Sequence, residues 1–229
     1  MKNMITLLPF VIALILQVAT LHAAESAEAG AAKAGDLGDN ETVSLFNGKD
    51  LDGWHIYLKD SRTDPKEVWK VKEGVIWCKG DPFGFLRTKE KYGDFKLVLE
   101  WRWPEEPTNS GVLLRMSDGD KIWPLCLEAQ LKHERAGDVV GMGCDFNENI
   151  RPAGEFFRVA PRRNPSSEKK TGEWNTYEII CKGDTVELFV NGEFQNRATG
   201  VQVSDRGYIG LQSEGSPIMF RNIYLTPLR

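Results

Sequence analysis

The sequence predicts an all-β protein built as a two-sheet antiparallel β-sandwich, and three observations support this prediction. Apolar residues alternate with polar ones in many short stretches, turn-forming residues separate these stretches, and no long amphipathic helical pattern occurs. Alternation with a period of two is typical of strands buried on one face. Many such strands without long helices are typical of antiparallel sandwiches.

The clearest strands lie in the middle of the chain. Residues 95–103 place apolar side chains at every second position. Residues 112–116 should direct Val112, Leu114 and Met116 to the core, and Leu113 and Arg115 outward. The next strand has two distinct faces, one apolar with Leu125, Leu127, Ala129 and Leu131, and one mostly polar with Cys126, Glu128, Gln130 and Lys132.

A hairpin is predicted where Asn191-Gly192 separates two β-rich runs, because both residues tolerate positive φ. By contrast, residues 135–173 contain many Gly and Pro residues and should form long irregular loops, which are candidate functional elements. Further strands are expected near 43–46, 54–57, 68–71, 75–78, 84–87, 208–212 and 218–225.

The N-terminal region has the features of a secretory signal peptide. Lys2 precedes an apolar run over Ile5–Val18, and small residues follow up to Ala23. A membrane anchor is the alternative, but the run is shorter than the roughly 20 apolar residues that span a bilayer. We therefore expect a signal peptide over 1–23, a flexible linker over 24–40, one domain over 41–229, and a secreted or periplasmic protein without a membrane span in its mature chain.

Charge and motif content exclude several functional classes. The formal net charge is −4 and no basic stripe occurs, which argues against nucleic-acid binding. Only His55 and His133 follow the signal region, so a three-histidine zinc site is excluded. The sequence lacks the glycine-rich motifs of serine hydrolases, P-loop proteins and Rossmann folds.

Four cysteines leave the disulfide pattern open. Export permits disulfides, and Cys78, Cys126, Cys144 and Cys181 allow three complete pairings. Free buried thiols are a further alternative. The oligomeric state is not defined by the sequence.

Ten short motifs occur in a fixed order along the predicted domain. They are Leu45–Trp54, Val71–Ile76, Gly84–Thr88, Tyr92–Phe95, Asn109–Arg115, Glu128–Leu131 with Ala136–Asp138, Gly172–Glu178, Val190–Gly192, Gly210–Ser213 and Phe220–Ile223. As an ordered set covering about 45–227, they resemble the 3-keto-disaccharide hydrolase family. This resemblance implies a concanavalin A-like or laminin-G-like jelly roll, a carbohydrate substrate and cleavage of 3-keto-glycosides.

The implied chemistry is an elimination followed by a hydration. A ketone at C3 acidifies the proton on C2, a base removes it, and the resulting enolate expels the C1 substituent before water adds. Such a site needs a base with a pKa near neutrality, a positive group or metal for the enolate, and an acid for the leaving oxygen.

Three residues near the strand over 125–131 could supply these catalytic groups. We hypothesise that Glu128 is the acid/base, His133 a second proton-transfer group and Arg115 the stabiliser of the enolate. Glu128 should share a sheet face with Gln130, about 7 Å away along the strand. Arg115 is expected to project from the polar face of a nearby strand.

Other residues of the same region are candidates for substrate binding. Gln130 and Asn109 could hold hydroxyl groups, and Trp123 could stack on a sugar ring. Asp138 could orient His133 or bind a metal. A divalent metal is compatible with these residue types, but no tight ligand spacing specifies one.

Non-catalytic alternatives stay open at this point. Glu128 and Gln130 could line a solvated sheet face, and Arg115 could form a cross-strand ion pair with Glu100. The whole domain could also be a carbohydrate-binding, laminin-G-like module without activity. A module predicts a flat exposed aromatic platform, whereas an enzyme predicts a recessed polar site with a perturbed carboxylate.

Overall fold

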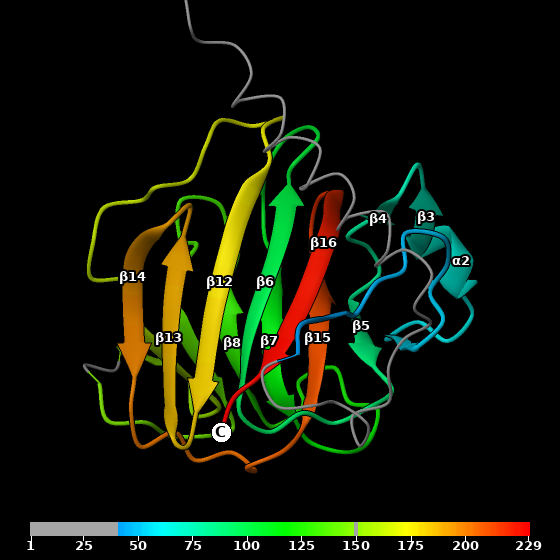
Figure 1. Ribbon diagram of the computed structural model, residues 1–229. Helices are drawn as coiled ribbons and strands as arrows, with labels where there is room; N and C mark the ends of the chain where they lie inside the picture. The colour runs from blue at the N-terminus through cyan, green and yellow to red at the C-terminus, as the bar shows by residue number, and fades with distance from the viewer. Residues whose placement is uncertain (1–40, 149–150) are drawn as a thin grey trace, which may run out of the picture. The chain divides into compact units, whose positions relative to one another are not determined.

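The protein is described by a computed structural model that covers residues 41–148 and 151–229. Two eight-stranded antiparallel sheets make up this part of the chain, which confirms the predicted sandwich (Figure 1). The predicted signal peptide and linker lie outside the described residues. Within the described part, no helix is long and apolar enough to span a bilayer.

The first sheet contains the longest strands and includes both the predicted hairpin and the end of the chain. Its order is β14 (Glu193–Ala198), β13 (Thr185–Val190), β12 (Asn175–Lys182), β6 (Phe95–Arg102), β16 (Ile218–Pro227), β4 (Val75–Cys78) and β3 (Trp69–Lys72), with β1 (Val43–Ser44) also paired to β16. Between β13 and β14, Asn191 and Gly192 have φ values of 52° and 83°. The hairpin prediction is thereby confirmed.

The second sheet contains the strand that carries Glu128, the candidate acid/base. Its order is β10 (Arg151–Ala153), β11 (Phe157–Ala160), β9 (Val139–Met142), β8 (Cys126–Gln130), β7 (Gly111–Met116), β15 (Tyr208–Ser213), β5 (Gly84–Thr88) and β2 (Trp54–Leu58). A short helix, α2 (Pro65–Val68), precedes β3. β8 and β7 are therefore central strands, and their backbones are held on both sides.

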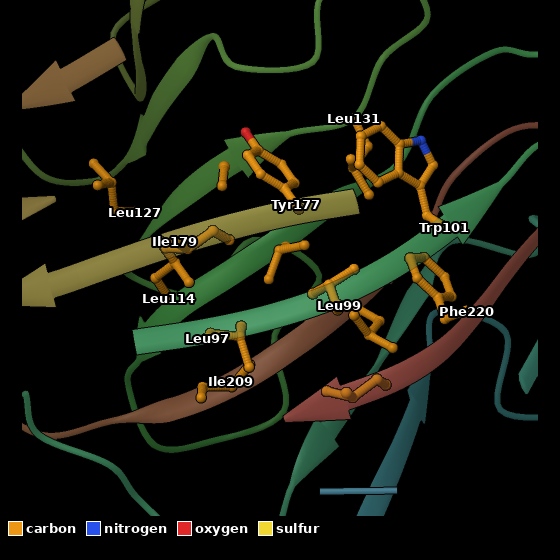
Figure 2. Packing of buried hydrophobic residues seen from close by; sticks show 14 of the residues in the cluster. Leu97, Leu99, Trp101, Leu114, Leu127, Leu131, Tyr177, Ile179, Ile209 and Phe220 are labelled. Atoms are coloured by element: carbon orange, nitrogen blue, oxygen red, sulfur yellow. The ribbon is translucent and has the colours of Figure 1, made fainter. Parts of the chain in front are cut away.

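The main core fills the space between the two sheets (Figure 2). From the first sheet, β6 contributes Leu97, Leu99 and Trp101 at alternating positions, as the pattern over 95–103 predicted. The second sheet contributes buried side chains from β7, β8 and β15, including Leu114, Leu127 and Ile209. One face of the second sheet is thus fixed against the first, and its other face points away from it.

Two sequence predictions require correction. Residues 135–173 are not wholly irregular, because they contain the short strands β9, β10 and β11, which are three or four residues long and too brief to give a clear alternation. The alternation over 112–116 also breaks at its end. Arg115 has a φ of 51°, and the pairing of β7 with β15 shifts register beside it, so Met116 joins an outer cluster instead of the main core.

All four cysteines are buried and free in this structure. None of the three complete pairings that the sequence allowed is formed. Burial raises the pKa of the Cys78 and Cys181 thiols to about 12, so both are protonated at neutral pH.

Candidate active site on the outer face of the second sheet

The outer face of the second sheet carries a buried carboxyl group at its centre. Leu127 and Ala129 of β8 belong to the main core, so Glu128 between them points to the opposite side. Across the strands, Glu128 lies opposite Leu113 of β7, and Leu113 lies opposite Gly210 of β15. The predicted division of β8 into two faces is therefore confirmed for Leu127, Ala129 and Glu128, whereas Leu125, predicted on the apolar face, precedes the strand and is exposed.

The Glu128 side chain is only 3% exposed, and none of the described protein groups donates a hydrogen bond to its Oε1. Burial raises its pKa well above the ordinary value of 4.5, and the nearby Glu214 carboxylate raises it further. Its carboxyl group lies over Gly111, where a Cβ atom would come within 2.6 Å of Cδ. The missing side chain at Gly111 provides the room that this carboxyl group occupies.

Three further side chains with oxygen atoms lie beside Glu128, where β7 begins and β15 ends. Oε1 of Gln212 and Oδ1 of Asn109 are buried without a donor among the described groups. Asn109 and Glu214 pair through their backbones, and the Asn109 side chain hydrogen-bonds Glu214. Burial nevertheless raises the pKa of Glu214 above its ordinary value. The result is a group of four oxygen-bearing side chains, which we call the acceptor cluster: Asn109, Glu128, Gln212 and Glu214.

A positive group occupies the same face of the sheet. Arg87 lies on β5 directly opposite Gly210, in the cross-strand row that begins at Glu128. Its guanidinium carbon stacks 3.9 Å from the centre of the Tyr208 ring, and Nη1 donates to the Thr88 carbonyl. Stacking and this single bond fix the guanidinium while its Nε, which is buried, has no acceptor among the described groups.

A family model described as a 3-keto-alpha-glucoside-1,2-lyase-like domain matches residues 41–226. The chain belongs to this family. The match covers both sheets and every residue of the acceptor cluster, which agrees with the resemblance found from the ordered motifs.

Several known proteins are similar to this chain at low sequence identity. A 3-keto-disaccharide hydrolase of Bacteroides thetaiotaomicron is 24% identical over an aligned length of 226, and the alignment covers 79% of this chain and 76% of that protein. A protein of Parabacteroides distasonis with a provisional glycosyl hydrolase name has a crystal structure with a TM-score of 0.61, at 21% identity over 82% of this chain and 94% of that one. The carbohydrate-binding module CBM66 of Bacillus subtilis gives a TM-score of 0.53, at 15% identity over 75% of this chain and 93% of that module.

Within this family member, the structure brings some of the predicted residues together. Glu128 and Asn109 both belong to the acceptor cluster, and Trp123 packs against the outer apolar cluster that borders Glu128. Gln130 lies on the same face, but its Oε1 accepts hydrogen bonds from the backbone N–H groups of Leu131 and Lys132. That oxygen thus binds the backbone N–H groups that directly follow β8.

Arg115 is not on this face, which corrects the placement predicted from alternation. Its Nη2 donates to Oδ1 of Asp94 at 2.8 Å, and its Nη1 donates to the carbonyl of Gly183 at 2.6 Å. Asp94 precedes β6 and Gly183 connects β12 to β13, so Arg115 links the second sheet to the first. The left-handed backbone at Arg115 turns the side chain toward the first sheet. Its partner is Asp94 instead of Glu100, which pairs with Arg221.

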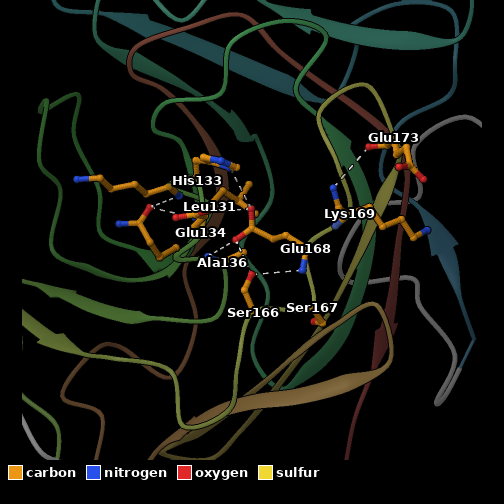
Figure 3. A network of polar contacts seen from close by, with 12 residues as sticks. Leu131, His133, Glu134, Ala136, Ser166, Ser167, Glu168, Lys169 and Glu173 are labelled. Carbon is orange, nitrogen blue, oxygen red and sulfur yellow. Dashed lines mark hydrogen bonds and ion pairs between the residues drawn. The ribbon is translucent and has the colours of Figure 1, made fainter.

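His133 and Asp138 take part in contacts of the loop that follows β8. Nδ1 of His133 lies 3.7 Å from the Glu168 carboxylate, which also accepts from the N–H groups of Glu134 and Ala136 (Figure 3). Asp138 accepts from the N–H of Arg162 at 2.8 Å. Both residues thus have partners in this loop region.

The sequence reasoning missed Arg87, Gln212 and Glu214. Arg87 and Gln212 stand within quoted motifs, at alternating positions that share a face with Glu128 once the strand order is known. Among residues 41–148 and 151–229, no group of three or more His, Cys, Asp or Glu side chains is arranged to hold a metal ion.

Proposed function

We propose that this protein is an enzyme that cleaves 3-keto-glycosides through elimination and hydration, with Glu128 as the proton-transfer group. The observation that carries the proposal is the buried carboxyl group of Glu128, whose pKa is raised by burial and whose Oε1 has no donor among the described groups. A general base works best when its pKa lies near the working pH, and burial moves a carboxyl group in that direction. Membership of the family supports the same reaction class.

The acceptor cluster supports a polyhydroxylated substrate. Sugar hydroxyl groups are hydrogen-bond donors, and the buried oxygens of Gln212 and Asn109 lack protein donors among the described residues. A bound sugar ring would satisfy these acceptors, which otherwise carry a desolvation cost of about 1–3 kcal/mol each. We therefore place the oxidised ring over this cluster.

The roles in the reaction follow from charge. Ionised Glu128 takes the C2 proton, the C1–oxygen bond breaks with its electrons on the leaving oxygen, and a C1–C2 double bond forms. Water then adds its oxygen to C1 and a proton to C2, so the net reaction consumes one water. Glu214, which also has a raised pKa, protonates the leaving oxygen.

A non-catalytic carbohydrate-binding module is the competing function. Such a module is expected to present a flat aromatic platform, but the rings on this face meet at interplanar angles of 62° to 87°. A perturbed buried carboxyl group also favours the enzyme. We further propose that residues 1–23 direct the protein out of the cytoplasm, which would place the reaction in the periplasm or outside the cell.

The test is turnover of 3-keto-trehalose in D2O, with unoxidised trehalose as the control substrate. We expect release of the second sugar and one deuterium at C2 of the product, because that carbon loses and regains a proton. Release without deuterium would refute the elimination route, and absence of release would refute the proposed function.

The residue assignment is tested by Glu128→Gln with Glu178→Gln as its matched control. Glu178 lies on the outer face of the other sheet and pairs with Lys96. Loss of a general acid or base lowers kcat by about 10²–10⁴-fold, and we expect this for Glu128→Gln alone. Equal rates for both variants would remove Glu128 from the mechanism.

A further inference from the structure

A row of aromatic side chains extends along the outer face of the second sheet. It consists of Phe83, Trp123, Phe157 and Phe156, which we call the aromatic strip. Successive ring centres are 6.0, 5.6 and 5.1 Å apart and meet edge to face. The four residues come from three separate segments of the chain, before β5, before β8 and at the start of β11.

The strip remains partly open to solvent. Phe83 is 38% exposed and Phe156 is 40% exposed. Leu125, two residues after Trp123 in sequence, is 40% exposed as well. Large apolar side chains are seldom left exposed together unless they contact a ligand or a partner.

The strip borders the acceptor cluster. Trp123 and Phe157 pack on an outer apolar cluster, whose members are Phe85, Leu113, Met116, Cys126 and Met142. Leu113 lies directly opposite Glu128, and Cys126 precedes Glu128 by two residues on the same face. Two residues along a strand span about 7 Å, so a molecule placed over Glu128 reaches the strip with its next group.

We propose that the aromatic strip binds the group that leaves from C1, and that it favours a flat apolar aglycone, such as an aryl ring, over a second sugar. This inference rests on the proposed function, because it assigns the other half of the same substrate. The strip offers ring faces and edges with apolar neighbours. A sugar would place hydroxyl groups against this surface without hydrogen-bond partners, whereas an aryl ring needs none.

The loop that carries Trp123 is fastened to the sheet, which supports a preformed binding surface. Asp120 pairs with Nε2 of His55 on β2 at 3.0 Å. Asp118 pairs with Lys91 at 2.8 Å and accepts from the Tyr208 hydroxyl at 3.1 Å. Because the loop is held before a ligand arrives, binding an aglycone to Trp123 requires little ordering.

The experiment compares a phenyl 3-keto-glucoside with 3-keto-trehalose on Phe83→Ala and Phe156→Ala, whose partial exposure keeps the cost to folding small. Phe189→Ala is the matched control, since Phe189 forms a similar edge-to-face pair with Phe194 on the first sheet, at 5.5 Å. We expect each strip variant to lower kcat/KM for the phenyl substrate by about tenfold, and that for 3-keto-trehalose by less than about threefold. Equal losses on both substrates, or losses as large in the control, would overturn the proposal.

A binding measurement separates failure of this inference from failure of the proposed function. Phenyl glucoside without the ketone cannot undergo elimination, and saturation-transfer NMR reports which of its protons touch the protein. We expect stronger transfer to the phenyl than to the sugar protons, reduced in Phe83→Ala and Phe156→Ala. If the wild type cleaves neither substrate but this pattern of saturation transfer is observed, the proposed reaction is refuted and the aryl site is supported. If saturation transfer to the phenyl protons is unchanged in both Phe83→Ala and Phe156→Ala, the aryl site is refuted.

Discussion

Gly111→Ala is expected to disable the site without removing any polar group. Gly111 lies on β7 beneath the Glu128 carboxyl group, and its φ is outside the left-handed region, so alanine adds no backbone strain. The new Cβ would come within 2.6 Å of Glu128 Cδ and 2.7 Å of Cγ. The substitution therefore acts on one neighbouring side chain.

The size of the effect follows from these distances. An ordinary carbon–carbon contact needs about 3.4 Å or more, so the carboxyl carbon must retreat by at least about 0.8 Å. A displacement of about 1 Å at a reacting group costs on the order of 100-fold in rate. Because the moving part is the end of a flexible side chain, the fold should survive the change.

The assay is kcat/KM on 3-keto-trehalose, with thermal unfolding measured on the same preparations. Gly93→Ala is the control, since its added Cβ would meet its nearest neighbour at 3.4 Å, in ordinary contact, and no residue of the acceptor cluster is among its neighbours. Combining Gly111→Ala with Glu128→Gln should add little to the loss from Glu128→Gln alone, because both act through one carboxyl group. A folded Gly111→Ala protein with wild-type kcat/KM would refute the placement of Glu128 at the reacting centre.

Two further predictions concern stability. Burial raises the pKa of Glu128 in the folded state, so the ionised form is disfavoured there, and the wild-type protein should lose stability as the pH rises above about 4.5, the pKa of Glu128 in the unfolded chain. Glu128→Gln should therefore match the wild-type melting temperature near pH 4 and exceed it near pH 8. A difference in melting temperature that does not grow with pH would contradict the raised pKa. Arg115→Met should lower the free energy of unfolding by about 3 kcal/mol, because it removes the ion-pair partner of Asp94 and the donor to the Gly183 carbonyl, and leaves the Asp94 carboxylate only the N–H of Gly183 as a donor among the described groups. An unchanged urea midpoint would show that this link contributes nothing.

The two-sheet fold was predictable because its signals are local. Alternation over 95–103 and the two faces of β8 depend only on the period of a strand, and Asn191-Gly192 depends only on turn geometry. The position of Arg115 was not predictable in this way. A bulge inserts one residue into the alternation, and its presence depends on the pairing of β7 with β15, two strands about a hundred residues apart in sequence.

The site was predictable only where its residues lie close in sequence. Glu128 was found because β8 has one apolar face and one polar face. Gln212 and Glu214 come from β15, whose place beside β7 is a long-range feature that periodicity does not report. Arg87 was missed for the same reason, because the pairing of its strand, β5, with β15 is also a long-range feature. In each case the strand order, and not the local pattern, brings the side chain to the same face of the sheet as Glu128.

The position of Glu128 in a central strand explains how a buried carboxyl group is tolerated. An isolated buried acid weakens the folded state when it ionises, so it must sit where other interactions hold the backbone firmly. β8 is hydrogen-bonded to β7 on one side and β9 on the other, and Leu127 and Ala129 anchor it in the main core. The core between the sheets thus stabilises the fold, which leaves the outer face free to hold a carboxyl group in a state that favours proton transfer.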